Sequence, residues 1–205
     1  MAIQMVDLNN SQQLETLICS IDEYLKTAVK NKRYEHSKRT AETAEEMCRI
    51  YGLNPRIGYL AGIAHDMCKE ISSEEMRKLV SLDGMPVSEL EDNKPNLLHG
   101  RAAAVLIKQK FGVEDSDVIE AIACHTFAAP GLCDLGKILF AADKIEPGRP
   151  QSTEEYRAAL FNKNITEMTY SILQENIEYL ERKGHSVAAA SFELLEQLKK
   201  ALQEK

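Results

Sequence analysis

The sequence lacks the features that would carry a chain into or across a membrane. No apolar run approaches the roughly 20 residues that a helix needs to span a bilayer. The first residues, MAIQMVDLNNSQQLE, contain neither the basic segment nor the apolar core of a secretory signal. We therefore expect a cytoplasmic protein with no membrane partner.

The sequence also lacks paired cysteines and a basic charge balance. Its five cysteines are odd in number and contain no CxxC pair, which is typical of scattered buried thiols rather than of a disulfide framework. With 25 Lys and Arg against 32 Asp and Glu, the formal net charge is −7. This argues against a nucleic-acid partner, which normally requires a basic face. A small phosphorylated substrate remains compatible, because bound metal ions supply positive charge locally.

No segment alternates apolar and polar residues as a half-buried strand does, and no internal repeat or long linker divides the chain. Apolar residues instead recur at three- and four-residue spacing nearly throughout, which predicts helices. We expect one all-α domain over residues 1–205, with a core at about 30–150 and a C-terminal helical extension at about 151–205 packed on it. The helices are expected to begin near residues 11, 36, 55, 72, 96, 115, 132, 153, 165 and 186.

Local signals place several of the helix ends. Gly52 and Gly112 follow periodic segments and are expected to end two helices. The pair Asn54-Pro55 is typical of a helix start, with a capping residue followed by proline at the first helical position. The stretch from 83 to 95 is polar and contains proline, so we expect a loop with one helical turn.

Six residues of metal-ligand type recur along the chain in the order H…HD…H…H…D. The gaps between them are 29, 33, 26 and 18 residues, each about one or two helices long. Neutral imidazole and carboxylate are the ligands that hold zinc, iron or manganese. The six residues are His36, His65, Asp66, His99, His125 and Asp143.

A single histidine on an apolar helix is more often a hydrogen-bonded core residue than a metal ligand, so the argument depends on the set. His36 shares a helix face with Thr40 and Ala44 and should point inward. Asp143 ends a strongly apolar segment, where burying a carboxylate is costly unless a cation or hydrogen bonds offset it. A site for two metal ions explains these placements together and indicates phosphoester or phosphoanhydride hydrolysis. His185 lies outside the pattern and is expected to be a surface residue.

The segments around these residues resemble the motifs of a known family. HSKRTAETAEEM, AGIAHDMCKE, LLHGRAAA, AIACHT and KILFAADKIEPGR look like the motifs of the HD-domain metal-dependent phosphohydrolases. They are most similar to the YqeK-type branch, the symmetrical bis(5'-nucleosyl)-tetraphosphatases. The resemblance runs from about Arg33 to Arg149, with no departure at any ligand position.

The resemblance implies a helical HD fold with two metal ions, iron in the first place, with manganese, cobalt or zinc as alternatives. One ion would be held by His36, His65, Asp66 and Asp143. The other would be held by His99 and His125, with Asp66 bridging the two. The implied substrate is a small dinucleoside polyphosphate, diadenosine tetraphosphate, cut in the middle to give two ADP.

Four further residues are candidates for contact with the substrate phosphates. Lys69 lies three residues after Asp66, so its ammonium could reach them, and we assign it and Asp66 to catalysis. Arg149 follows a Pro-Gly turn that could present its guanidinium to phosphate. Arg33, shortly before the first histidine, is the third candidate. Thr126 is the fourth, either orienting a ligand or touching phosphate.

Other functions remain open on the sequence alone. The same metals would serve another HD-type nucleotide phosphatase or phosphodiesterase. A nucleotide-sensing module with little turnover would keep the ligand set without fast catalysis. A purely structural helical bundle is the third alternative. Apolar helix faces would also support a homodimer, which the pattern does not distinguish from core packing.

Overall fold

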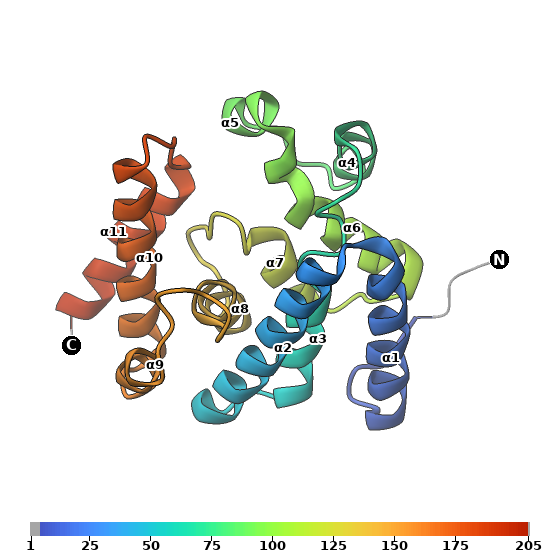
Figure 1. The fold of residues 1–205 in the computed structure, drawn as a ribbon, viewed down its shortest axis with the longest axis horizontal. Coiled ribbons are helices and arrows are strands. Elements are labelled where there is room, and N and C mark those ends of the chain that lie inside the picture. The colour runs from blue at the N-terminus through green and yellow to red at the C-terminus, as the bar shows by residue number, and fades with distance from the viewer. Residues whose placement is uncertain (1–4, 205) are drawn as a thin grey trace.

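The chain is mostly helical in the part described by the computed structural model, residues 5–204. Within that range there are eleven α-helices, one 3₁₀ helix and no strand, which confirms the all-α expectation (Figure 1). The helices are α1 (Ser11–Ala28), α2 (Asn31–Tyr51), α3 (Pro55–Ala64), α4 (Ser73–Val80), α5 (Glu89–Asn93), the 3₁₀ helix η1 (Pro95–Leu98), α6 (His99–Phe111), α7 (Ser116–Cys124), α8 (Asp134–Ile145), α9 (Glu154–Phe161), α10 (Ile165–Arg182) and α11 (Ala189–Gln203). No helix of this part is long and apolar enough to cross a membrane.

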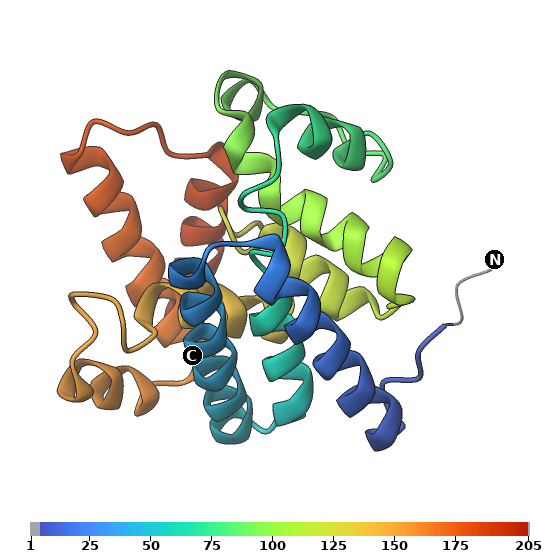
Figure 2. The ribbon, with the colours of Figure 1, turned by 45° about the vertical axis from the view of Figure 1, so that its right-hand side comes forward.

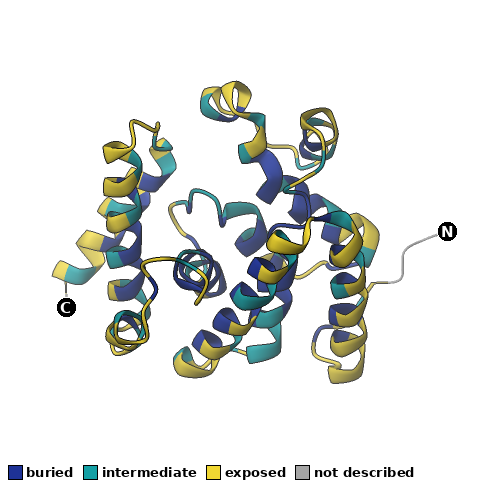
Figure 3. Ribbon diagram, in the orientation of Figure 1, coloured by how far each residue is buried: buried dark blue, intermediate teal, exposed yellow. Residues whose placement is uncertain are grey.

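Helix α8 lies at the centre of the fold and is seen end-on in Figure 1. It packs against α2, α3, α7 and α10, and nine of its twelve residues are buried, as its dark colour in Figure 3 shows. A helix that is apolar on all sides belongs in the interior. Asp143, near the end of α8, is therefore carried into the core of the protein.

Helices α2 and α3 form a tightly packed pair that brings two predicted ligands to the same end. Gly52, at φ 77°, ends α2, and the side chain of Asn54 caps α3. At Gly62 the two backbones are so close that a Cβ atom would lie 2.4 Å from the Cα of Ala41. His36, early in α2, and His65, just after α3, consequently face each other with ring centroids 5.3 Å apart.

We expect Gly62→Ala to lower the free energy of unfolding by about 1–3 kcal/mol, the usual cost of overpacking a core. The added methyl group meets backbone atoms of α2, which move only if the two helices separate. Urea denaturation of metal-free protein measures the change. An unchanged midpoint would show that α2 and α3 pack less closely than they do in this structure.

The C-terminal helices pack on the central helix, as expected from the sequence. Met168, Ile172 and Leu173 of α10 are buried and belong to the same apolar core as α8. Helix α11 packs against α10 in turn, and Figure 2 shows the two side by side. Two helix starts differ from the expectation, because α2 begins at Asn31 rather than near residue 36 and α11 begins at Ala189 rather than near residue 186.

Candidate metal centre

The structure brings all six predicted ligands together in the interior. They come from five different helical segments, and each is at most 7 % exposed. Two lie within helices, one begins a helix, and three lie immediately after a helix end. They are His36 in α2, His65 and Asp66 after α3, His99 at the start of α6, His125 after α7 and Asp143 in α8.

Asp66 lies between two pairs of histidines. Its Oδ2 is 3.4 Å from His65 Nε2 and 3.7 Å from His36 Nε2. Its Oδ1 is 3.1 Å from His99 Nε2 and 3.7 Å from His125 Nε2. Burial alone would raise the pKa of this carboxyl, but the surrounding histidines outweigh it and hold the pKa well below its usual value. The carboxylate is therefore ionised, with one oxygen facing each histidine pair.

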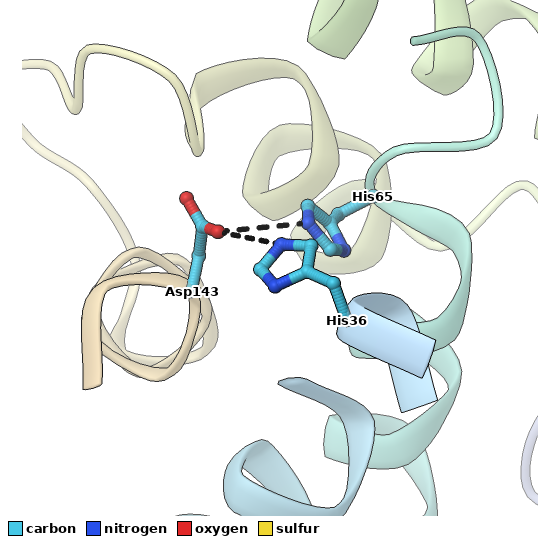
Figure 4. A group of neighbouring side chains, drawn as sticks. All are labelled: His36, His65 and Asp143. Atoms are coloured by element: carbon cyan, nitrogen blue, oxygen red, sulfur yellow. Dashed lines mark ion pairs between the residues drawn. The ribbon is translucent and has the colours of Figure 1, made fainter. Parts of the chain in front are cut away.

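His36, His65 and Asp143 form one half of the centre (Figure 4). Asp143 Oδ1 lies 3.0 Å from His36 Nε2 and 3.8 Å from His65 Nε2. Despite these distances, neither Nε2 atom makes a hydrogen bond. Buried nitrogen atoms without a partner are costly, whereas nitrogen and oxygen lone pairs that converge on one point are what a metal ion needs. These residues therefore fit a metal ion.

The hydrogen bonds of three histidine rings aim the Nε2 atoms at the centre. In His65, His99 and His125 the Nδ1 atom lies 2.7, 2.7 and 2.8 Å from the backbone carbonyl oxygen three residues earlier. A carbonyl oxygen only accepts, so Nδ1 carries the proton and Nε2 keeps its lone pair. Such bonds fix the tautomer and orientation of ligating histidines in metalloproteins.

Glu146 fixes the orientation of the His36 ring in the same way, through a hydrogen bond at Nδ1. This residue was not among those predicted from the sequence. Its Oε1 accepts a hydrogen bond from His36 Nδ1 at 3.0 Å, and its Oε2 accepts one from Arg39 Nε at 2.5 Å. Burial raises the pKa of Glu146, but the bonds from His36 and Arg39 outweigh this and bring it to about 2. The available signal was its position three residues after Asp143, near the same face of α8.

We expect Glu146→Gln to weaken metal binding by about 10- to 100-fold, the usual effect of losing a carboxylate behind a ligating histidine. The amide keeps the shape but loses the negative charge shared by His36 and Arg39. Metal titration of chelator-treated protein measures the affinity. Glu193→Gln, at an exposed position of α11, is the matched control. Equal affinities for the two variants would contradict the positioning role.

The predicted arginines both lie at the centre, where they pair with its carboxylates. Arg33 Nη1 donates to Asp66 Oδ2 at 2.7 Å. Arg149 Nη2 donates to Asp143 Oδ1 at 2.6 Å, and its Nε donates to the carbonyl oxygen of the same residue. Both arginine side chains are about one-third exposed, so they are accessible from solvent as well as in contact with the centre.

Lys69 and Thr126 approach the other half of the centre. Lys69 Nζ is 3.1 Å from His99 Nε2, and Thr126 Oγ1 is 3.5 Å from the same atom. A further cation that the sequence analysis missed, Lys144, donates to Asp143 Oδ2 at 2.6 Å. Together with Arg33, Arg149 and Arg39, these lysines give five cations beside three carboxylates, those of Asp66, Asp143 and Glu146. A net positive rim of this kind suits an anionic ligand in an otherwise acidic protein.

His185, which stood outside the ligand pattern, is exposed in the loop before α11, as expected.

Comparisons with known proteins identify the family to which this chain belongs. The HD domain family matches residues 33–148, a span that contains all six candidate ligands. The symmetrical bis(5'-nucleosyl)-tetraphosphatase of Bacillus subtilis (strain 168) is 29 % identical over 87 % of this chain and 92 % of its own length. The protein of the same name from Staphylococcus aureus (strain NCTC 8325 / PS 47) is 31 % identical over 79 % of this chain and 84 % of its own.

A solved structure is similar in fold as well. The crystal structure of a predicted HD superfamily hydrolase involved in NAD metabolism, from Clostridium acetobutylicum, matches with a TM-score of 0.82 at 27 % identity. The match covers 89 % of this chain and 97 % of that one. The chain therefore belongs to the HD-domain family of hydrolases. Within it, the chain belongs to the family of the symmetrical bis(5'-nucleosyl)-tetraphosphatases.

Proposed function

We propose that this enzyme hydrolyses diadenosine tetraphosphate at its middle anhydride to give two ADP. The observation that carries the proposal is the position of Asp66, whose two oxygens face two separate histidine pairs. This arrangement supports two adjacent metal ions, the kind of site that acts on phosphoanhydrides. The relatives named for this reaction cover most of the chain.

In this proposal His36, His65, Asp66 and Asp143 hold one ion, and His99 and His125 hold the other, with Asp66 shared. Imidazole and carboxylate ligands suit iron, which is the metal we propose, and would also accept manganese, cobalt or zinc. When bound, such ions lower the pKa of water enough to supply hydroxide at neutral pH and stabilise negative charge on phosphate oxygens.

The protein residues orient the ligands and the substrate. Hydrogen bonds at Nδ1 hold the histidine rings so that each Nε2 faces the centre. Lys69, Arg149 and Arg33 bind the phosphates through charge-assisted hydrogen bonds. Thr126, 3.5 Å from His99 Nε2, helps to place the phosphates or that ligand. One water is consumed for each tetraphosphate, and the departing ADP carries the charge that the cations on the rim neutralise.

Chromatography of the products from diadenosine tetraphosphate tests the proposal. We expect ADP alone from protein loaded with iron or manganese. AMP together with ATP would contradict symmetric cleavage and indicate another HD-type nucleotide hydrolase. Tight nucleotide binding without any product would instead support a sensing module.

A further inference from the structure

Two hollows adjoin the metal centre, and neither is explained by metal binding. The first, which we call the α10 hollow, has a volume of about 720 Å³ and lies between the end of α8, the 149–151 turn and the helices α9 and α10. Its wall includes Lys144, Arg149, Tyr156, Asn176 and Tyr179. Tyr179 is 50 % exposed, so part of its side chain is available for contact with a ligand, and Lys183 Nζ lies 6.0 Å from the centroid of its ring.

The second, the α11 hollow, has a volume of about 350 Å³ and lies between the loop after α7 and the start of α11. Its wall includes Thr126, Phe127, Lys144, Asn176 and His185. The two volumes fall within the range of about 300–1,000 Å³ that is typical of small-molecule sites. Both hollows combine aromatic rings with a few polar groups, which is the usual lining of such sites.

The hollows reach the centre from its two halves. Lys144 and Arg149, in the wall of the α10 hollow, contact the two oxygens of Asp143. Thr126, in the wall of the α11 hollow, lies 3.5 Å from His99 Nε2. Lys144 and Asn176 belong to both walls, so the two hollows share a boundary, and Lys144 places that boundary next to Asp143. An elongated anion lying across the centre would therefore have one end in each.

The backbone around Phe127 is held in an unusual conformation. Ala128 has a φ of 57°, the one positive value at a non-glycine residue among residues 5–204. Its N–H donates to the carbonyl oxygen of Cys124, and Ser191 Oγ of α11 donates to the carbonyl oxygen of Phe127. Strain of this kind persists where the surroundings impose it, most often at ligand sites. Here it fixes the loop that forms one wall of the α11 hollow.

We propose that the two hollows hold the two nucleosides of a dinucleoside polyphosphate, one each, with the bases against Tyr179 and Phe127. The inference rests on the proposed function, which places the middle phosphates at the metals. Base stacking on an aromatic ring is tolerant of base identity, so the assignment accounts for binding at both ends without a base-reading motif. It also accounts for cleavage at the middle, because a nucleoside held in each hollow leaves the central phosphates beside the metals.

The test combines product binding with kinetics of the metal-loaded enzyme. Isothermal titration with ADP should show two molecules bound per chain of the native protein. Tyr179→Leu and Phe127→Leu keep an apolar side chain but remove the stacking ring, and each should weaken one of the two ADP sites. Each should also raise KM for diadenosine tetraphosphate by about 5- to 100-fold, with kcat changed much less.

Phe192→Leu is the matched control, because Phe192 is an exposed aromatic residue of α11 that lines neither hollow. One ADP per chain, or Leu variants that behave like this control, would overturn the assignment even if the enzyme splits the tetraphosphate. Two ADP sites that respond to the two variants, in an enzyme that yields no ADP from the tetraphosphate, would uphold the hollows as nucleoside sites and reject the proposed function instead.

Discussion

Asp66→Ala is expected to reduce hydrolysis of diadenosine tetraphosphate by at least about 10³-fold and to remove both metal ions. The size of the effect follows from the position of the carboxylate. One of its oxygens faces the pair His36 and His65, and the other faces the pair His99 and His125. One substitution therefore removes a ligand from each ion. The variant also removes Asp66 Oδ2, which accepts a hydrogen bond from Arg33 Nη1 at 2.7 Å. Metal analysis and turnover are measured on the same preparation.

The same variant separates an enzyme from a purely structural bundle. If the six residues serve only to pack the core, Asp66→Ala leaves the metal content of the protein as it was and does not reduce its stability. Asp92→Ala provides the control, because Asp92 is exposed and pairs with Arg77 at the surface. Such surface pairs contribute about 0–1 kcal/mol, so this control should retain both metal and activity.

Lys69→Met is expected to lower kcat by about 10²- to 10³-fold, the usual effect of removing one preorganised group that stabilises developing charge. The ammonium lies 3.1 Å from His99 Nε2, at the half of the centre opposite Asp143. Methionine preserves much of the length and packing of the side chain. Because the lost charge is positive, the variant should bind at least as much metal as the native enzyme.

Lys78→Met is the comparison for this variant, since Lys78 is exposed and pairs only with Glu74 within α4. We expect its kcat to equal that of the native protein. If kcat of Lys69→Met also stays within about twofold, Lys69 is a solvated lysine and the phosphate contact is wrong. If its metal content falls as well, the residue supports the centre rather than the substrate.

Much of the fold could be predicted because its signals are local. Gly52 and Gly112 do end helices in the left-handed conformation, and Asn54 does cap α3. The errors occur where tertiary contacts decide. The segment expected as one helix from residue 96 begins instead with the 3₁₀ helix Pro95–Leu98, and His99 opens α6.

The residues of the candidate site also fall into two groups, those that the sequence identified and those that became visible only in the folded structure. The six ligand-type residues could be found from residue type and spacing, because few side chains bind metals and all six lie in segments with a helical pattern. Glu146 and Lys144 were missed, because charged residues at the end of a helix usually face solvent and position relative to Asp143 was the one signal for them. Only the packing of α2 against α8 brings Glu146 to His36. The roles of all these residues as ligands and substrate contacts remain predictions.

The most direct test of the account is a metal titration of activity. Protein stripped with a chelator is reloaded with iron(II) under anaerobic conditions, and ADP formation from diadenosine tetraphosphate is followed at each step. We predict no turnover without metal and a rise that saturates near two ions per chain, with ADP as the sole product. Full turnover by the stripped protein, or no turnover after loading with iron or manganese, would contradict the account.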